Sequence, residues 1–434
     1  MKKIIYIVAI TLAIFQTAVY AQNSYVMKLD SLAQNKEFFK LRNMINSLPS
    51  GNSFSKEESL FISSLLKANF EFPKSMDDVN TFVSDILKSD FPTTLKAKVF
   101  KYTYDYALNS SYYFFDFNSI NLYNEKLFPP AKSEFDDEEL EDNDNYLKIL
   151  QSLTNLSPPS VKILKDEHID YYLDVAKLIN LPVDFNGDSQ NFIFDTGANL
   201  PVIVSSLAAK HKMKLFETDI KVGTITDIKV NSKIAICDSL KIGNVVFYNT
   251  AFLVLPDESL TFANGFYKIN GIIGLPQMRL LSAITIARDD SKMIFHKNLT
   301  SPGLNNLAFD GLTPVFMLTQ NSDTLTFTFD TGAQKTLLYK KYFDKFKNNI
   351  IGKYSETDIE VGGAGGSQKV KGYILDKVYL DFETLPIEIK DVRLLSESMK
   401  KKDTMFFGNL GLDMIWQFKE ITINFANMSI NLSN

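Results

Sequence analysis

The side chains of this 434-residue chain that could do chemistry are carboxylates and hydroxyls, with backbone amides beside them. A zinc site made of cysteine and histidine is not expected, because the chain has one cysteine, Cys237, and three widely separated histidines, His168, His211 and His296. Haem and iron–sulfur centres lack ligands for the same reason. A single cysteine also excludes an intramolecular disulfide scaffold. Any catalysis must therefore come from carboxylates, hydroxyls or the backbone.

One acidic motif occurs twice in the second half of the chain. Residues 191–198 read NFIFDTGA and residues 326–333 read TFTFDTGA, an offset of 135 residues. Two further matches follow at an offset of 137 residues: GIIGL at 271–275 with GNLGL at 408–412, and ITI at 284–286 with ITI at 421–423. Landmarks that recur in the same order within β-rich runs predict a duplicated β lobe.

Two aspartates, Asp195 and Asp330, follow the repeated strands at matched positions. In a duplicated lobe, we expect the two carboxylates to face each other across a pseudo-twofold axis. Carboxylates that share a site do not both ionise easily, so the pair titrates as a unit. The ionised member can take a proton from water, and the protonated member can polarise the carbonyl oxygen of a substrate.

The residues beside the aspartates suit this chemistry. Gly197 and Gly332 permit a tight turn that brings backbone N–H groups against the carboxylates. Thr196 and Thr331 carry hydroxyls that could bond across the interface of the two lobes. A single Asp-Thr-Gly tripeptide is usually an ordinary turn, but two copies in a duplicated context, each with a second matched motif downstream, indicate a catalytic pair.

The repeated Asp-Thr-Gly-Ala motif, followed each time by a segment that ends in glycine, resembles the aspartic protease superfamily. The alanine after Asp-Thr-Gly is similar to that of retropepsin-like members. The combination of this motif with a leader peptide and a helical N-terminal region resembles the secreted retropepsin-like aspartyl proteases of Bacteroidetes-type bacteria. The resemblance covers residues 172–434. It implies two β-barrel-like lobes, hydrolysis of peptide bonds by an activated water molecule, and no cofactor or metal.

The resemblance also implies a role for individual residues. Asp195 and Asp330 would be the catalytic pair, and four neighbours would support the active-site loops: Thr196, Gly197, Thr331 and Gly332. The segments that pack under these loops would include Ile273, Gly274, Leu410 and Gly411. Asn409 departs from the apolar pattern of the family at this point. Retropepsins form one lobe per chain and dimerise, so two lobes in one chain imply a monomer.

Flaps, the hairpins that close over the substrate in this superfamily, are expected at matched distances after each aspartate. The candidates are Gly223 and Thr224 in the first lobe, and Gly362, Gly363, Gly365 and Gly366 in the second. Glycines at a hairpin tip permit a close approach to a peptide backbone. The alternative interpretation of both segments is an ordinary surface turn.

The first half of the chain has a different periodicity. From about residue 25 to residue 128, apolar residues recur at three- and four-residue spacing, which is typical of short amphipathic helices. An aromatic cluster within residues 102–117 is expected to form a core. The acidic run SEFDDEELEDNDN at residues 133–145 is interpreted as a solvated linker or loop, with a further helical stretch after it.

The expected fold class is therefore α+β with several domains, in which a helical N-terminal domain precedes a bilobal all-β acid-protease fold with pseudo-twofold symmetry. The expected boundaries are a signal peptide at residues 1–21, a helical accessory domain at 22–132, an acidic linker plus helix at 133–170, a first protease lobe at 171–303 and a second at 304–434.

The first 21 residues have the pattern of an export signal. Lys2 and Lys3 precede an apolar run, and small residues then offer a cleavage site before Gln22. No later segment approaches about 18 uninterrupted apolar residues, so stable membrane insertion is not expected after leader cleavage. The chain has 46 basic and 51 acidic residues, which argues against nucleic acid as the main partner. A periplasmic or extracellular location is expected.

The sequence thus predicts an exported aspartic endopeptidase that acts on peptide or protein substrates. The alternative is a catalytically silent peptide- or protein-binding module on the same bilobal fold, because fold does not guarantee function. The helical region is interpreted as a permanent accessory domain, with an inhibitory pro-segment as the rival interpretation.

Overall fold

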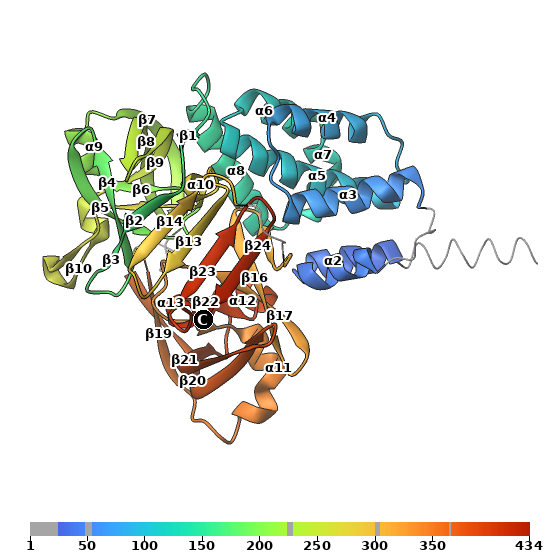
Figure 1. Ribbon diagram of the computed structural model, residues 1–434. Coiled ribbons are helices and arrows are strands. Elements are labelled where there is room, and N and C mark those ends of the chain that lie inside the picture. Colours follow the sequence, from blue (N-terminus) through green and yellow to red (C-terminus); the bar gives the residue numbers. More distant parts are fainter. Residues whose placement is uncertain (1–24, 48–53, 224–228, 300–303, 364–365) are drawn as a thin grey trace, which may run out of the picture.

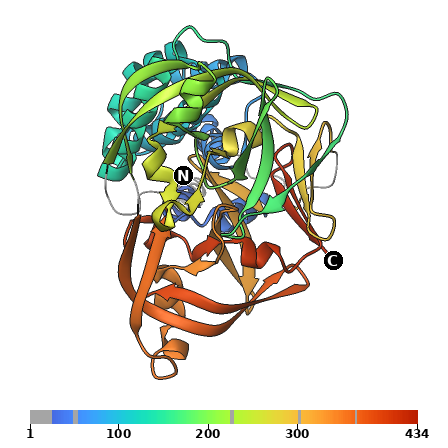
Figure 2. The ribbon, with the colours of Figure 1, turned by 90° about the vertical axis from the view of Figure 1, so that its left-hand side faces the viewer.

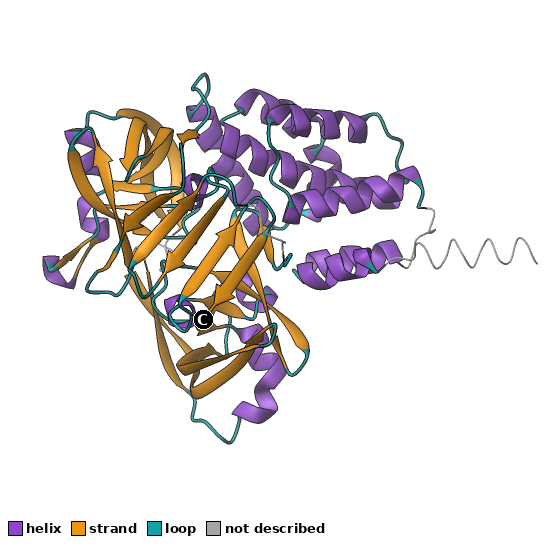
Figure 3. Cartoon of the chain, in the orientation of Figure 1, coloured by secondary structure: helices purple, strands orange, loops and turns teal. Residues whose placement is uncertain are grey.

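The computed structural model describes residues 25–47, 54–223, 229–299, 304–363 and 366–434 (Figure 1). The predicted signal peptide at residues 1–21 lies outside the described residues. Helices of residues 25–152 gather on one side of the molecule, and a large β-rich region formed by residues 160–434 occupies the other (Figure 3). The change of periodicity along the sequence therefore marks a change of architecture, consistent with an α+β fold.

The N-terminal region is built around one long helix, α5, which contacts α3, α4, α6, α7 and α8. The aromatic side chains of the 102–117 cluster supply much of this core, and Tyr104 is fully buried. Ser55 and Glu58 form a capping box at the start of α3. The helical segments are residues 25–34, α2 (Phe38–Asn46), α3 (Lys56–Phe70), α4 (Met76–Leu87), α5 (Thr93–Phe114), α6 (Phe117–Lys126), α7 (Phe128–Ala131), η1 (Lys132–Glu134) and α8 (Asp137–Ser152).

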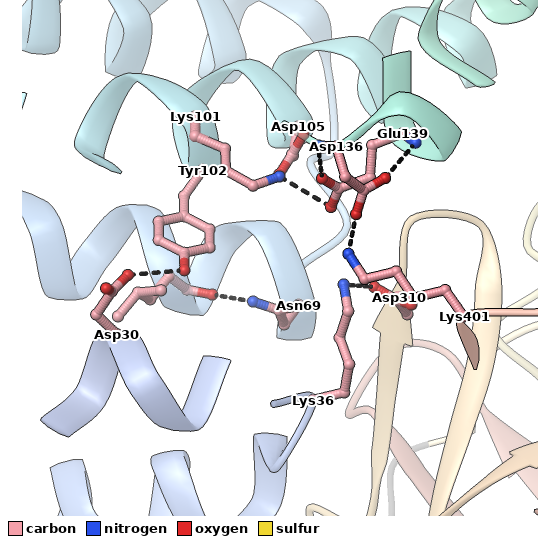
Figure 4. A network of polar contacts seen from close by, with 11 residues as sticks. Asp30, Lys36, Asn69, Lys101, Tyr102, Asp105, Asp136, Glu139, Asp310 and Lys401 are labelled. Carbon is pink, nitrogen blue, oxygen red and sulfur yellow. Dashed lines mark hydrogen bonds and ion pairs between the residues drawn. The ribbon is translucent and has the colours of Figure 1, made fainter. Parts of the chain in front are cut away.

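The acidic run is not a solvated linker, and this prediction was wrong. Asp136 and Glu139 form a capping box that starts α8, and acidic residues in a first turn are favourable beside the positive end of the helix. Two lysines offset part of the charge: Lys101 of α5 pairs with Glu139, and Lys401 of the β region pairs with Asp136 (Figure 4). The run is therefore the start of a capped helix, with two of its carboxylates paired to lysines from other segments.

Strands begin before residue 171, the boundary expected for the first lobe. The first strand pairs with β9 and the second pairs with β14, so residues 160–170 belong to the β region. Within the described residues, a nine-stranded sheet comprises β1 (Ser160–Lys162), β3 (Tyr172–Leu173), β4 (Ile179–Phe185), β5 (Asp188–Phe194), β6 (Val202–Val204), β7 (Lys214–Gly223), β8 (Lys229–Ile242), β9 (Val245–Leu255) and β12 (Gly271–Ile273).

A second large sheet has eight strands in the described residues: β15 (Leu307–Asp310), β16 (Thr313–Gln320), β17 (Asp323–Phe329), β18 (Leu337–Leu338), β19 (Thr357–Gly363), β20 (Gly366–Phe382), β21 (Leu385–Leu395) and β22 (Gly408–Leu410). The first sheet contains the order β9-β6-β12-β5-β4-β8-β7. The second has the order β15-β16-β17-β22-β18-β21-β20-β19, with a further pairing between β16 and β20. The repeated motifs of the sequence therefore occupy corresponding strands, and the two sheets lie one above the other in Figure 2.

A five-stranded sheet joins the two large sheets. It contains β2 (Glu167–Asp170), β13 (Ala283–Ala287), β14 (Lys292–His296), β23 (Glu420–Asn424) and β24 (Ser429–Ser433). The two ITI triplets pair directly here, with Thr285 opposite Thr422 and their hydroxyl oxygens 2.7 Å apart. Equivalent residues of the repeat thus meet each other at the centre of the β region.

The remaining elements are short. They are β10 (Thr261–Phe262), β11 (Tyr267–Lys268), α9 (Ser205–Lys210), α10 (Leu275–Met278), α11 (Lys340–Ile350), α12 (Lys402–Met405), α13 (Leu412–Ile415), η2 (Asp257–Leu260) and η3 (Ala263–Gly265). Among the helices in the described ranges, none combines the length and the apolar character needed to cross a membrane.

Candidate active site

The two aspartates lie directly after buried strands that are held in the same way. Asp195 follows β5, and its N–H donates to the carbonyl of Ile273 at 3.0 Å. Asp330 follows β17, and its N–H donates to the carbonyl of Leu410 at 3.0 Å. In both places a short parallel strand, β12 or β22, runs beside the aspartate strand. The two segments expected to support the active-site loops therefore lie against them.

Four hydrogen bonds tie the two aspartate loops together. The Thr196 hydroxyl donates to the carbonyl of Phe329 at 3.0 Å, and the Thr331 hydroxyl donates to the carbonyl of Phe194 at 2.9 Å. Each hydroxyl also accepts a bond from the backbone N–H of the other threonine, at 3.0 Å. Both threonines are buried. The bonds expected across the interface of the two halves are thus present, and each is matched by an equivalent from the opposite side.

Each carboxylate accepts a backbone hydrogen bond from its own loop and touches the loop of the other half. The N–H of Gly197 donates to Asp195 Oδ1 at 2.7 Å, and the N–H of Gly332 donates to Asp330 Oδ1 at 2.8 Å. A Cβ atom built on Gly332 would lie 2.4 Å from Cγ of Asp195, and one on Gly197 would lie 2.9 Å from Cγ of Asp330. Both glycines are therefore required by close packing, and the two carboxyl groups are neighbours.

The proximity of the carboxyl groups perturbs their ionisation. Burial raises the pKa of Asp195 well above its usual range, and the negative charge of Asp330 and a hydrogen bond to it raise it further. The backbone N–H groups of Gly197 and Gly332 act in the opposite direction but less strongly. The pair therefore retains a proton at pH values where an isolated aspartate has lost it, which is the state that acid–base chemistry between two carboxyls requires.

The supporting segments pass close beneath the loops. A Cβ atom on Gly274 would lie 2.5 Å from the carbonyl oxygen of Ala198, and one on Gly411 would lie 2.7 Å from that of Ala333. These same carbonyls accept hydrogen bonds from the N–H groups of Leu275 and Leu412, at 2.9 and 2.8 Å. Ile273 and Leu410 are buried in the core below. These contacts explain why glycine follows the apolar residue in both segments.

Both candidate flaps lie at the ends of antiparallel hairpins. Gly223 ends β7 and pairs with Lys229 of β8, while Gly362 and Gly363 end β19 and pair with Ser367 and Gly366 of β20. Two of the predicted flap residues, Thr224 and Gly365, lie outside the described residues. Helix α8 packs against β7, so the helical region contacts the strand that leads to the first hairpin end.

Asn409 is a residue of this site whose role sequence reasoning missed. Its side-chain N–H donates to Asp330 Oδ2 at 2.9 Å, and its amide oxygen accepts a bond of 2.6 Å from the hydroxyl of Thr328. A signal was present in the sequence, because Asn409 interrupts the apolar pattern that Ile272 follows in the first half.

The helical region is anchored to the segments that build the site. The Tyr112 hydroxyl donates to the carbonyl of Asn199, three residues after Thr196, at 3.4 Å. The guanidinium of Arg279, next to α10, stacks on the rings of Tyr113 and Phe72, at 3.5 and 4.0 Å from their centroids. Burial lowers the pKa of Arg279 to about 10. Arg279 therefore makes cation–π interactions with two aromatic side chains of the helical region.

A polar cavity of about 630 Å³ separates the two regions beside these anchors. It is lined by charged side chains that pair between the two regions, Lys36 with Asp310 at 2.6 Å and Asp136 with Lys401 (Figure 4). The paired charges connect helical and β regions at a second place, so the helical region is held by both stacking and ion pairs.

The first aspartate lies in a segment that matches a known protein family. No curated protein is significantly similar in sequence to this chain. Among solved structures, the chain is similar to Basic 7S globulin from soybean, with 10% identity, 62% of this chain and 95% of that chain covered, and a TM-score of 0.40. Residues 181–276, which contain Asp195 and Gly274, match the family described as aspartyl protease.

Proposed function

We propose that this protein is an aspartic endopeptidase that hydrolyses peptide bonds with a water molecule activated between Asp195 and Asp330. The observation that carries the proposal is the joint position of the two carboxyls. They are fixed by the hydrogen bonds of Thr196 and Thr331 and by close packing against Gly197 and Gly332. The aspartyl protease family match supports the same reaction class.

The chemistry follows from one shared proton. The ionised carboxyl takes a proton from water as the water oxygen attacks the substrate carbonyl, and the protonated carboxyl gives its proton to the carbonyl oxygen. A neutral tetrahedral intermediate results. It collapses when the carboxyl that took the proton from water passes it to the leaving amine and the other carboxyl takes a proton back from a hydroxyl of the intermediate, which restores the pair. The rigid setting of the pair favours this reaction because catalytic groups held in place need little reorganisation.

The proposed arrangement is bilobal, with each large sheet supplying one aspartate around a pseudo-twofold axis. The pairing of Thr285 with Thr422, and the reciprocal bonds of the two loop threonines, support this symmetry. Because both aspartates belong to one chain, we propose that a monomer is active. The glycine-rich hairpin ends at β7–β8 and β19–β20 are proposed as flaps, and peptides or proteins as the substrates.

Export is part of the proposal and rests on the amino-terminal sequence. The basic and apolar pattern of residues 1–21 favours removal of a leader and a periplasmic or extracellular location. Detection of a mature chain that begins at Gln22 in the periplasm or medium of the producing cell would support it. Retention of Met1 in a cytoplasmic product would contradict it.

The deciding experiment is cleavage of an unbiased peptide library by residues 22–434 across the acidic to neutral pH range, followed by mass spectrometry. We expect internal cleavage by the wild-type protein and none by D195N or D330N. Both variants keep the side-chain shape, so a single cooperative thermal transition shows that the fold is intact. A well-folded wild-type protein that cleaves no peptide at any pH would contradict the proposal and favour a silent binding module.

A further inference from the structure

The two aspartates have different surroundings, although their loops are built alike. Asp330 accepts two N–H bonds, one from Gly332 on Oδ1 at 2.8 Å and one from the side chain of Asn409 on Oδ2 at 2.9 Å. Asp195 accepts the bond from Gly197 at 2.7 Å and is also stabilised in its charged form by the N–H of Gly332, but the apolar side chain of Ile272 occupies the place that corresponds to the Asn409 amide. An amide N–H near a carboxylate stabilises its charged form.

The orientation of the Asn409 amide is fixed by a chain of hydrogen bonds. The Thr328 hydroxyl donates to Asn409 Oδ1 at 2.6 Å, which turns the NH2 group towards Asp330. The Tyr339 hydroxyl is bonded in turn to Thr328. Thr328 and Tyr339 are both buried, and Tyr339 lies in an apolar cluster with Phe38 of α2. A buried chain of this kind has few alternative arrangements.

The corresponding positions of the first half are all apolar. Thr328 pairs with Asn409 across β17 and β22, as Ile193 pairs with Ile272 across β5 and β12. Tyr339 corresponds to Val204 in the first half, because their N–H groups donate to the carbonyls of Phe407 and Asn270, which are 137 residues apart. The three polar residues are thus a set confined to one half of the repeat.

We propose, on the basis of the proposed hydrolytic function, that Asn409 is a positioning residue that assigns the negative charge of the pair to Asp330 and leaves the shared proton on Asp195. Asp330 is then the base that removes a proton from water. Asp195 donates its proton to the carbonyl oxygen. The net charge of the pair is unchanged in this step, because one proton enters at Asp330 as another leaves Asp195.

The other titratable groups near the pair are consistent with this assignment. Burial raises the pKa of Tyr339, with smaller contributions from Asp403 and Asp330, so the Tyr339 hydroxyl keeps its proton and stays neutral. The carboxylate of Asp413, beyond β22, accepts bonds from the N–H and hydroxyl of Thr336, at 2.9 and 2.7 Å. Burial and the charge of Asp330 raise the pKa of Asp195, as expected for the member that keeps the proton.

The test is titration of the two carboxyls in N409L, where leucine keeps the branching of the asparagine side chain and removes the donor. In residues 22–434 labelled with ¹³C at the aspartate carboxyls, we expect the lower pKa of the pair to rise by about one to two pH units. The acid limb of the kcat/KM profile should move to higher pH by the same amount. The matched variant in the first half, I272L, should leave both unchanged.

A second pair of variants keeps the test valid if N409L does not fold. T328V removes the hydroxyl that orients Asn409 and should shift the lower pKa in the same direction, whereas T328S keeps the hydroxyl and should not. A folded N409L or T328V with the wild-type lower pKa would overturn the inference. The NMR titration needs no turnover, so it decides the role of Asn409 even if the wild-type protein hydrolyses no peptide and the proposed function fails.

Discussion

Replacing Thr196 with valine should weaken the link between the two aspartate loops by a predictable amount. The Thr196 hydroxyl donates to the carbonyl of Phe329 and accepts the N–H of Thr331, both at 3.0 Å. Thr196 is 1% exposed, so water cannot replace the lost partner of either group. A buried polar group without a partner costs about 1–3 kcal/mol, so two such groups should lower the free energy of unfolding by about 2–6 kcal/mol. Valine has the same branched shape, which keeps any cavity small.

The measurement is urea unfolding of residues 22–434 followed by tryptophan fluorescence. Trp416 is the single tryptophan, and its ring stacks on Tyr171 at 6.2 Å between centroids, so it reports the β region. T196S keeps the hydroxyl and should stay within about 1 kcal/mol of the wild type. A loss below about 0.5 kcal/mol in T196V, or an equal loss in T196S, would refute the role given to these bonds.

Three other predictions concern the pair and its neighbours. D195N or D330N alone should lower kcat by roughly 10²–10⁴-fold or more without loss of fold, because a shared proton needs both carboxyls; substantial residual activity would contradict the dyad. Burial raises the pKa of Asp195 in the folded protein, so the contribution of Asp195 to stability is complete below its unfolded pKa and is lost as pH rises through its folded pKa. The melting temperature of D195N should therefore increase relative to that of the wild type as pH rises from acidic to neutral. A constant difference between the two melting temperatures over this pH range would contradict this. Residues 157–434, which retain β1 and β2, should cleave short peptides at rates similar to those of residues 22–434, and the two proteins should differ only in their rates on folded protein substrates. If residues 22–434 were inactive on short peptides and residues 157–434 were active, the helical region would instead be a pro-segment.

Local patterns in the sequence were sufficient for the features that depend on neighbours along the chain. The period of apolar residues separates a helical region from a β-rich one. The repeat of Asp-Thr-Gly predicts that matched aspartates follow matched strands, which the register of β5 with β12 and of β17 with β22 reproduces. The acidic run was misinterpreted because its charge was read as a sign of a solvated linker, although Asp136 and Glu139 have the spacing of a capping box.

The sequence by itself determined which residues could react. The chain has one cysteine and three histidines but repeats Asp-Thr-Gly, so carboxylates are the side chains available for catalysis. Only the tertiary structure decided how these groups differ. Asn409 reaches Asp330 from a strand that lies 79 residues away in the sequence, and Thr328 and Tyr339 orient it. Likewise, the docking of the helical region depends on Arg279 meeting Tyr113 and Phe72. Such contacts arise from packing between distant segments, so their partners appear only once the chain is folded.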